Sequence, residues 1–242
     1  MELKDILDEA FISVAPKGMN RVSSSMCGSC STETAMKHAM AKYAHEKRGG
    51  MDIMPENMDE WLNSCMKNEA PGTPNYAIMS LRGGFHGRLF GSLSASTSKA
   101  IMKMDVAAFD WPKMDAPLYK YPLDDNKEYN HQQDLSALKS MEDTMERYEK
   151  EKGIETCAVI VEPILAEGGD INLSRFFLNE MRNRTKKMGK YMIVDEVQTG
   201  VVTSGKFWMH ENFELDSPPD FMCFAKKMQA CGFYHNDDTK MQ

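Results

Sequence analysis

Ionisable side chains stand at the ends of three successive apolar runs of the sequence. Glu162 follows "CAVIV", Asp195 follows "YMIV", and Lys226 with Lys227 follows "DFMCFA". Apolar runs without polar alternation are typical of strands that are buried on both faces. In open α/β sheets, ligands bind outside the carboxyl ends of the strands. The pattern therefore predicts two acids and a base along one sheet edge, although polar residues also mark the ordinary exit of a buried strand.

A lysine amine, a carboxylate, an aromatic ring and a phosphate site together suit pyridoxal phosphate (PLP). The amine forms a Schiff base with the aldehyde, and a carboxylate beside the pyridine nitrogen keeps the ring protonated, so that it accepts electrons. The strand ends offer Lys226 or Lys227 as the amine and Asp195 as the carboxylate, and spacing alone does not choose between the lysines. A helix-capping pair is the alternative hypothesis for Asp195 and Glu196.

The remaining parts of a PLP site also have candidates in the sequence. An aromatic side chain can stack on the ring, and backbone N–H groups at a helix N-terminus can hold a phosphate. Glycine permits close approach of the backbone at such a turn. An ordinary loop histidine is the alternative for the histidine in "RGGFHG". These candidates are Gly28, Ser29, Phe85, His86 and Gln198.

Two cysteines in the stretch "MCGSCST" have the C-x-x-C spacing of metal ligands and of redox pairs. A zinc site needs four ligands, and the sequence holds no second C-x-x-C and no His pair with ligand spacing. The other hypotheses for Cys27 and Cys30 are a redox pair, half of an iron–sulfur ligand set, or a phosphate-binding turn that contains cysteine.

The elements that must position these residues alternate along the chain. Short apolar runs predict strands, and apolar side chains at helical spacing predict amphipathic helices between them. This alternation predicts an α/β fold with a mainly parallel central sheet and helices on both faces. The expected helices cover 31–46, 133–150 and about 174–188, and the expected strands lie within 76–81, 157–163, 191–198 and 220–227.

The composition argues against nucleic-acid binding, membrane-surface binding and a membrane-spanning segment. The 242 residues carry a formal net charge of -7 without a basic cluster, which argues against nucleic acid or an anionic membrane surface as a partner. No apolar run approaches the roughly 18 residues of a membrane span. The first residues, "MELKDILDEAFISV", match neither a signal peptide nor an Arg-rich transit peptide.

Five motifs together carry a resemblance to a known family. They are "GGFHGR" (83–88), "VEPILAEGGD" (161–170), "IVDEVQTG" (193–200), "GKFWMHENF" (205–213) and "FAKKM" (224–228). The sequence resembles the class III aminotransferases, PLP enzymes of fold type I that act on ω-amino acids. "AFDWP" (108–112), "KYPL" (120–123) and "CGSC" resemble the eukaryotic, mitochondrial branch that uses 4-aminobutyrate. The resemblance runs from about residue 20 to about residue 235.

The resemblance implies a role for each cofactor-site candidate. Lys226 is the implied Schiff-base lysine, Asp195 the partner of the pyridinium nitrogen, and Gln198 that of the phenolic oxygen. Phe85 stacks on the ring with His86 nearby, and Gly28 with Ser29 holds the phosphate. The implied catalytic residues are therefore Lys226 and Asp195.

The resemblance also implies a substrate site and a cluster. Arg88 binds the substrate carboxylate through a bidentate fork, Glu162 lines the pocket, and Glu167 pairs with an arginine from the C-terminal part of the family's chain. Across the two-fold axis of a homodimer, Cys27, Cys30 and their symmetry mates supply four thiolates to a [2Fe–2S] cluster.

The implied reaction converts 4-aminobutyrate and 2-oxoglutarate into succinate semialdehyde and glutamate, in the mitochondrial matrix. The implied organisation is a lead-in over 1–25, a partial PLP-binding large domain over 26–235 and a polar tail over 236–242, with the family's small C-terminal domain absent. Two alternatives stay open. One is a truncated, inactive chain that at most dimerises with full-length subunits, and the other is an ω-aminotransferase of the ornithine or β-alanine type.

Overall fold

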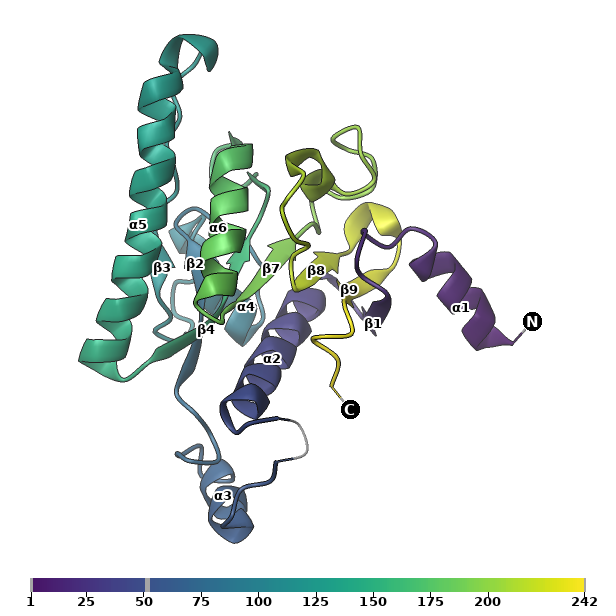
Figure 1. The fold of residues 1–242 in the computed structure, drawn as a ribbon, viewed down its shortest axis with the longest axis vertical. Coiled ribbons are helices and arrows are strands. Elements are labelled where there is room, and N and C mark those ends of the chain that lie inside the picture. The colour runs from purple at the N-terminus through teal and green to yellow at the C-terminus, as the bar shows by residue number, and fades with distance from the viewer. Residues whose placement is uncertain (1, 51–52, 242) are drawn as a thin grey trace.

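A mainly parallel sheet forms the centre of the computed structural model, which describes residues 2–50 and 53–241 (Figure 1). Over these residues seven strands pair in the order β1-β9-β8-β7-β4-β2-β3. Figure 1 shows this order from β3 on the left to β1 on the right, with the purple helix α1 beyond β1. The strands are β1 (Arg21–Ser25), β2 (Tyr76–Leu81), β3 (Lys113–Met114), β4 (Glu155–Val161), β7 (Tyr191–Asp195), β8 (Phe221–Phe224) and β9 (Cys231–His235).

Helices and short connections make up the rest of the fold. Pairing is parallel from β8 through β7, β4 and β2 to β3, and antiparallel at β9 and β1. A separate antiparallel pair joins β5 (Ile164–Leu165) to β6 (Ile171–Asn172). The α-helices are α1 (Leu3–Ile12), α2 (Gly28–Lys47), α3 (Met58–Cys65), α4 (Phe90–Ala95), α5 (Lys127–Lys152) and α6 (Arg175–Lys187). The 3₁₀ turns are η1 (Ala100–Met102), η2 (Asp124–Asn126), η3 (Met209–Phe213) and η4 (Lys226–Met228).

Burial on both faces explains why the strand sequences lack polar alternation. Successive residues of a strand point to opposite faces. In β4, Val159 packs in the cluster that contains residues of α5 and α6, whereas Ala158 and Ile160 pack in the cluster that contains residues of α2. Each of these strand side chains is fully buried. The predicted α/β class, with a mainly parallel sheet and helices on both faces, is confirmed.

Helices α2 and α5 are longer than the predicted ranges 31–46 and 133–150, and α6 lies within the predicted range of about 174–188. Cys27 caps α2, because its sulfur accepts the backbone N–H of Cys30. Ser174 caps α6 in the same way through the N–H of Phe177. Helix α5 ends at Gly153, which adopts a left-handed φ of 62°.

The N-terminal boundary at residue 25 does not match the sheet. Residues 21–25, expected in a lead-in segment, form β1 and pair with β9 in register from Arg21↔His235 to Ser25↔Cys231. Asp237, expected in a polar tail, accepts hydrogen bonds from Asn20 and Arg21 at 2.6 Å each. The serine-rich β1 lies at the sheet edge and is half-buried, so no apolar run marks it in the sequence. The division into domains otherwise stays a prediction.

The carboxyl ends of β4, β7 and β8 meet at one edge of the sheet, as the strand endings predict. Glu162 follows β4, Asp195 ends β7, and Lys226 lies two residues after β8. Within the described ranges, no helix combines the length and the apolar character needed to cross a membrane.

A strained loop after β7 generates a stability prediction. Val201 and Val202 adopt φ values of 63° and 64°, a left-handed conformation that crowds a β-branched side chain. Val202 is 58% exposed, so Val202→Gly relieves the strain at little packing cost. We expect it to raise the free energy of unfolding by about 0.5–1 kcal/mol, measured by urea denaturation. Val106→Gly, at an exposed loop valine without a positive φ, is the control and should bring no gain.

Candidate active site

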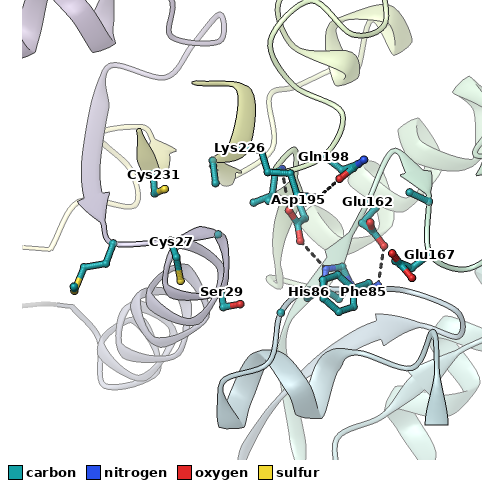
Figure 2. Close-up of a pocket in the computed structure, with 16 residues that line it drawn as sticks. Cys27, Ser29, Phe85, His86, Glu162, Glu167, Asp195, Gln198, Lys226 and Cys231 are labelled. Atoms are coloured by element: carbon teal, nitrogen blue, oxygen red, sulfur yellow. Dashed lines mark hydrogen bonds and ion pairs between the residues drawn. The ribbon is translucent and has the colours of Figure 1, made fainter. Parts of the chain in front are cut away.

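A cavity of about 390 Å³ opens at the carboxyl ends of β4, β7 and β8. Its size is in the range of pockets that bind small ligands. Figure 2 shows Asp195 and Lys226 near the middle, with two cysteines on one side and two glutamates on the other. The lining residues are Met26, Cys27, Gly28, Ser29, Phe85, His86, Gly87, Glu162, Ala166, Glu167, Asp195, Val197, Gln198, Ala225, Lys226 and Cys231.

The two candidate lysines take different positions relative to the cavity. Lys226 lines it, and its Nζ donates a hydrogen bond to Oε1 of Gln198. Lys227 is not a lining residue, and its Nζ donates to the backbone carbonyl of Gln198 at 2.6 Å. Lys226 is therefore the amine that can reach a ligand, and Lys227 fixes the loop that carries Gln198.

Asp195 is a buried carboxylate with two protein partners. Only 4% of its surface is exposed. Its Oδ2 lies 2.9 Å from Nδ1 of His86, and its Oδ1 accepts the backbone N–H of Val197 at 3.1 Å. The next residue does not share the site, because Oε1 of Glu196 accepts the backbone N–H of His210 at 2.7 Å and lies 2.7 Å from its Nδ1. The two acids that were candidates for one capping pair thus serve separate partners.

Glu162 is a second buried acid in the cavity wall. Its Oε1 accepts the backbone N–H of Phe85 at 2.8 Å, which holds the aromatic residue at the cavity. Burial, followed by the nearby charge of Asp195, raises the pKa of Glu162 to about 9. Near neutral pH this carboxyl is therefore protonated and places no second negative charge beside Asp195.

Glycines bring three segments together at the first turn of α2. A Cβ atom on Gly28 would lie 2.8 Å from Cγ1 of Val197, and one on Gly87 would lie 2.5 Å from Oγ of Ser29. Oγ of Ser29 accepts the backbone N–H of Arg88 at 3.2 Å. A serine hydroxyl and the N-terminus of a long helix therefore lie at the cavity wall, where an anionic group is stabilised.

The two residues expected to bind substrate differ in their placement. Glu167 lines the cavity and forms an ion pair with Lys99, which lowers the pKa of its carboxyl. Arg88 does not line the cavity. Its exposed guanidinium lies 5.9 Å from the centre of the Phe85 ring. The structure therefore does not bring Arg88 to the cavity wall, and its substrate role stays a prediction.

Cys27, directly before α2, lines the cavity, whereas Cys30 of the C-x-x-C pair does not. The sulfur atoms of Cys27 and Cys30 are 3.3 Å apart. The Cys30 backbone N–H holds the pKa of the Cys27 thiol below its usual value. Over residues 2–50 and 53–241, no group of three or more His, Cys, Asp or Glu side chains is arranged to hold a metal ion. The C-x-x-C pair therefore supplies two thiols, and the described residues form no complete metal site.

Sequence reasoning missed several parts of this site. Cys231 lines the cavity from β9, and no sequence signal placed β9 beside β1. Val197 could have been found, because it lies between two predicted site residues. The contacts that fix His86 were also missed: Oγ1 of Thr32 donates to its carbonyl at 2.6 Å, and its N–H donates to Oγ of Ser96 at 2.8 Å. Hydroxyl side chains carry no pattern that predicts such contacts.

The protonated state of Glu162 predicts how the free energy of unfolding depends on pH. Because the pKa is raised on folding, from 4.5 to about 9, the stability that the neutral carboxyl contributes is present below about pH 4.5. It is lost as the pH rises toward about 9. Glu162→Gln keeps an acceptor for the Phe85 N–H but cannot ionise. We expect this variant to exceed the wild type in unfolding free energy by at least about 1 kcal/mol at pH 9, and by much less at pH 5.

Urea denaturation between about pH 5 and pH 9 measures this difference. Glu167→Gln, at an acid whose pKa is lowered rather than raised, is the control and should show no such widening with pH. Parallel stability curves for the wild type and Glu162→Gln would contradict a protonated Glu162.

Comparisons with known proteins agree with this geometry. The model of the protein family "Aminotransferase class-III" matches residues 2–240 of this chain. A 4-aminobutyrate aminotransferase of Dictyostelium discoideum is 48% identical over 235 residues, which are 97% of this chain and 46% of the relative. The mitochondrial 4-aminobutyrate aminotransferase of Homo sapiens is 43% identical over 234 residues, again 97% and 46%.

A solved structure of lysine aminotransferase from M. tuberculosis superposes with a TM-score of 0.76 at 25% identity, over 96% of this chain and 47% of that one. The chain thus spans about half the length of the curated relatives it matches. With nearly all of its residues matched and its strand-end acids and lysine gathered in one cavity, the chain belongs to the class III aminotransferase family.

Proposed function

We propose that the protein to which this chain belongs transfers the amino group of 4-aminobutyrate to 2-oxoglutarate, forming succinate semialdehyde and glutamate, with PLP as its cofactor. The observation that carries the proposal is the gathering of Lys226, Gln198 and buried Asp195 from adjacent strand ends into one cavity. The names of the relatives, which are 4-aminobutyrate aminotransferases, support the choice of substrate.

The residues of the cavity fit PLP. The cavity offers an amine from Lys226, a buried carboxylate from Asp195, an aromatic ring from Phe85, and a helix N-terminus with the hydroxyl of Ser29. Gly28 approaches Val197 so closely that a Cβ atom would not fit, as expected of a turn that admits a phosphate. When bound, PLP supplies an electron-withdrawing ring that stabilises negative charge on the substrate carbon next to the amine.

The chain's own groups then have distinct tasks. Lys226 would bind the aldehyde and later move a proton at the substrate carbon through its Nζ. Asp195 would hold the ring nitrogen, Gln198 would bind the phenolic oxygen, and Phe85 would pack against the ring with His86 nearby. Ser29 and Gly28 would hold the phosphate.

The other end of the cavity suits the distant carboxylate of an ω-amino acid. Glu162 is neutral near pH 7 and does not repel that group. Glu167 is paired with Lys99, so its charge is balanced. Arg88, on the exposed loop next to Phe85, is the residue proposed to bind the carboxylate by moving toward the cavity.

The test of the cofactor site compares the two adjacent lysines. We expect Lys226→Ala to abolish the visible absorbance band that forms when PLP joins a lysine amine. Lys227→Ala, the matched control, should keep the band because Lys227 does not line the cavity. Borohydride reduction followed by peptide mapping locates the modified residue independently. A reduced label on Lys227, or an unchanged band in Lys226→Ala, would overturn the assignment.

Substrate choice is tested separately on the chain and on a protein of the relatives' full length. We expect the longer protein to form glutamate from 2-oxoglutarate fastest with 4-aminobutyrate in a panel that includes ornithine and β-alanine. A preference for ornithine or β-alanine would favour the sister activity. Cofactor binding by the chain without turnover would favour the alternative in which this chain is an inactive form.

The cysteine pair supports a proposal about assembly. Cys27 is exposed and the C-x-x-C pair of one chain holds two thiols, so two copies around a two-fold axis would supply the four thiolates that a [2Fe–2S] cluster takes. We expect a purified homodimer to contain iron and acid-labile sulfide, and Cys27→Ser to lose both. Cys65→Ser, remote from the pair in sequence, is the control. A dimer without iron would reject the cluster.

The mitochondrial matrix is the proposed location, supported by the mitochondrial naming of mammalian relatives. Fractionation of the cells that produce the protein tests it, and recovery in another compartment would reject it.

A further inference from the structure

Lys113 is a half-buried lysine without a carboxylate partner. It begins β3, the strand at one edge of the sheet (Figure 1). Its Nζ donates a hydrogen bond to the backbone carbonyl of Trp111 at 3.0 Å. Among the described residues no acid forms an ion pair with it, and the nearby Asp110 already pairs with Lys152 at 2.5 Å and accepts from Tyr148 at 3.1 Å. The ammonium form of Lys113 therefore has an uncharged acceptor and no balancing charge.

Two other cations, Lys103 and Arg82, place positive charge near this amine. Three backbone carbonyl oxygens at the C-terminal end of α4 lie within 3.5 Å of Nζ of Lys103. They fix that ammonium in place without neutralising it. Arg82 pairs with Asp115 at 3.1 Å on the surface, and an arginine does not lose its proton in proteins. Lys113 is therefore the member of this cationic cluster that gives up a proton most easily.

The surroundings of Lys113 make its amine a nucleophile. Burial, followed by the charge of Lys103, lowers the pKa of Lys113 to about 7. An ordinary lysine has a pKa of about 10.4 and is almost wholly protonated near neutral pH, whereas a large share of Lys113 is then uncharged. Desolvation and a neighbouring cation are the two conditions that activate a lysine amine toward carbonyl carbon.

The same surroundings favour an electrophile that is small and that leaves a negative charge. A small neutral molecule reaches a half-buried amine more easily than a bulky one. A negative charge on Nζ would also turn the repulsions from Lys103 and Arg82 into attractions. Carbon dioxide meets both conditions. The Nζ lone pair bonds to its carbon, one C=O electron pair moves to oxygen, and one proton leaves Nζ for the solvent, so the amine and CO₂ give a carbamate and H⁺.

We propose that Lys113 is a carbon dioxide site, where the amine forms a carbamate that Lys103 and Arg82 stabilise by their charge. None of these three residues lines the cavity at the ends of β4, β7 and β8. The proposal therefore does not depend on the proposed aminotransferase function, and either can fail without the other.

Trapping of the carbamate on the wild-type chain tests the site. The triethyloxonium ion converts a carbamate into a stable ethyl ester, which peptide mass mapping locates. After incubation with ¹³C-bicarbonate at about pH 7.4, we expect Lys113 to carry the ¹³C ester at least about 10-fold more often than Lys139, an exposed lysine of α5 paired with Asp143. Lys113→Arg should lose this label, and Lys139→Arg, the matched control, should keep it. Equal labelling of Lys113 and Lys139, or no label on Lys113, would overturn the proposal.

The role of the neighbouring charge is tested at Lys103. We expect Lys103→Met to lower the labelled fraction of Lys113 by at least about threefold, because the attraction for the carbamate is lost. Lys103→Arg keeps the charge and should keep most of the label, which separates the effect of charge from that of altered packing. Full labelling in Lys103→Met, or equal losses in both variants, would reject stabilisation by Lys103. The wild-type comparison of Lys113 with Lys139 decides the carbamate itself, however these variants fold.

Discussion

Burial of the Asp195 carboxylate at the end of β7 is the constraint on which the site depends. Removing this charge from water is costly unless donors replace the lost hydration. The loop after β2 meets that need by bringing the ring of His86 to Oδ2, and the chain after β7 turns so that Val197 N–H meets Oδ1. Two adjacent buried negative charges would be costlier still, and Glu162 therefore keeps its proton.

The sheet makes this arrangement possible because its parallel strands end side by side. The paired strands β4, β7 and β8 carry mainly apolar, buried residues on both faces, and their charged residues, Glu155 and Asp195, stand at the first or last position of a strand. Ionisable residues are confined to the strand ends, where three connections converge. A packed interior and a polar edge thus follow from the same pattern.

Much of this could be predicted from sequence, because long buried segments leave strong patterns. Strand β2 coincides with the predicted range 76–81, α2 and α5 cover the predicted ranges 31–46 and 133–150, and α6 lies within the predicted range of about 174–188. The edge strand β1 and its neighbour β9 were missed. Strand β1 is half-buried and serine-rich, and its pairing joins segments at opposite ends of the chain, which local periodicity cannot reveal.

The site was predicted in part for the same reason. Strand-end residues such as Asp195 and Lys226 were found, since a buried run points to its own end. Partners away from these strand ends were not found: Lys99 opposite Glu167, Thr32 and Ser96 around His86, and Cys231 at the cavity wall. Arg88 was predicted as a site residue but does not line the cavity, because a motif gives the residue type and not the direction of its side chain.

The pairing of β1 with β9 has a consequence for the order in which the molecule is built. The cavity wall takes residues from Met26 onward and from Ala225 to Cys231, and the nearby hydrogen bond from Asn20 to Asp237 spans 217 residues of sequence. Contacts so distant along the chain form slowly, because a long loop must close first. During synthesis, the first turn of α2 leaves the ribosome long before β8 and β9, whose residues complete the cavity wall. The pocket is thus among the last features to be completed, and a ribosome-bound chain that already contains α2 has no finished place for a ligand.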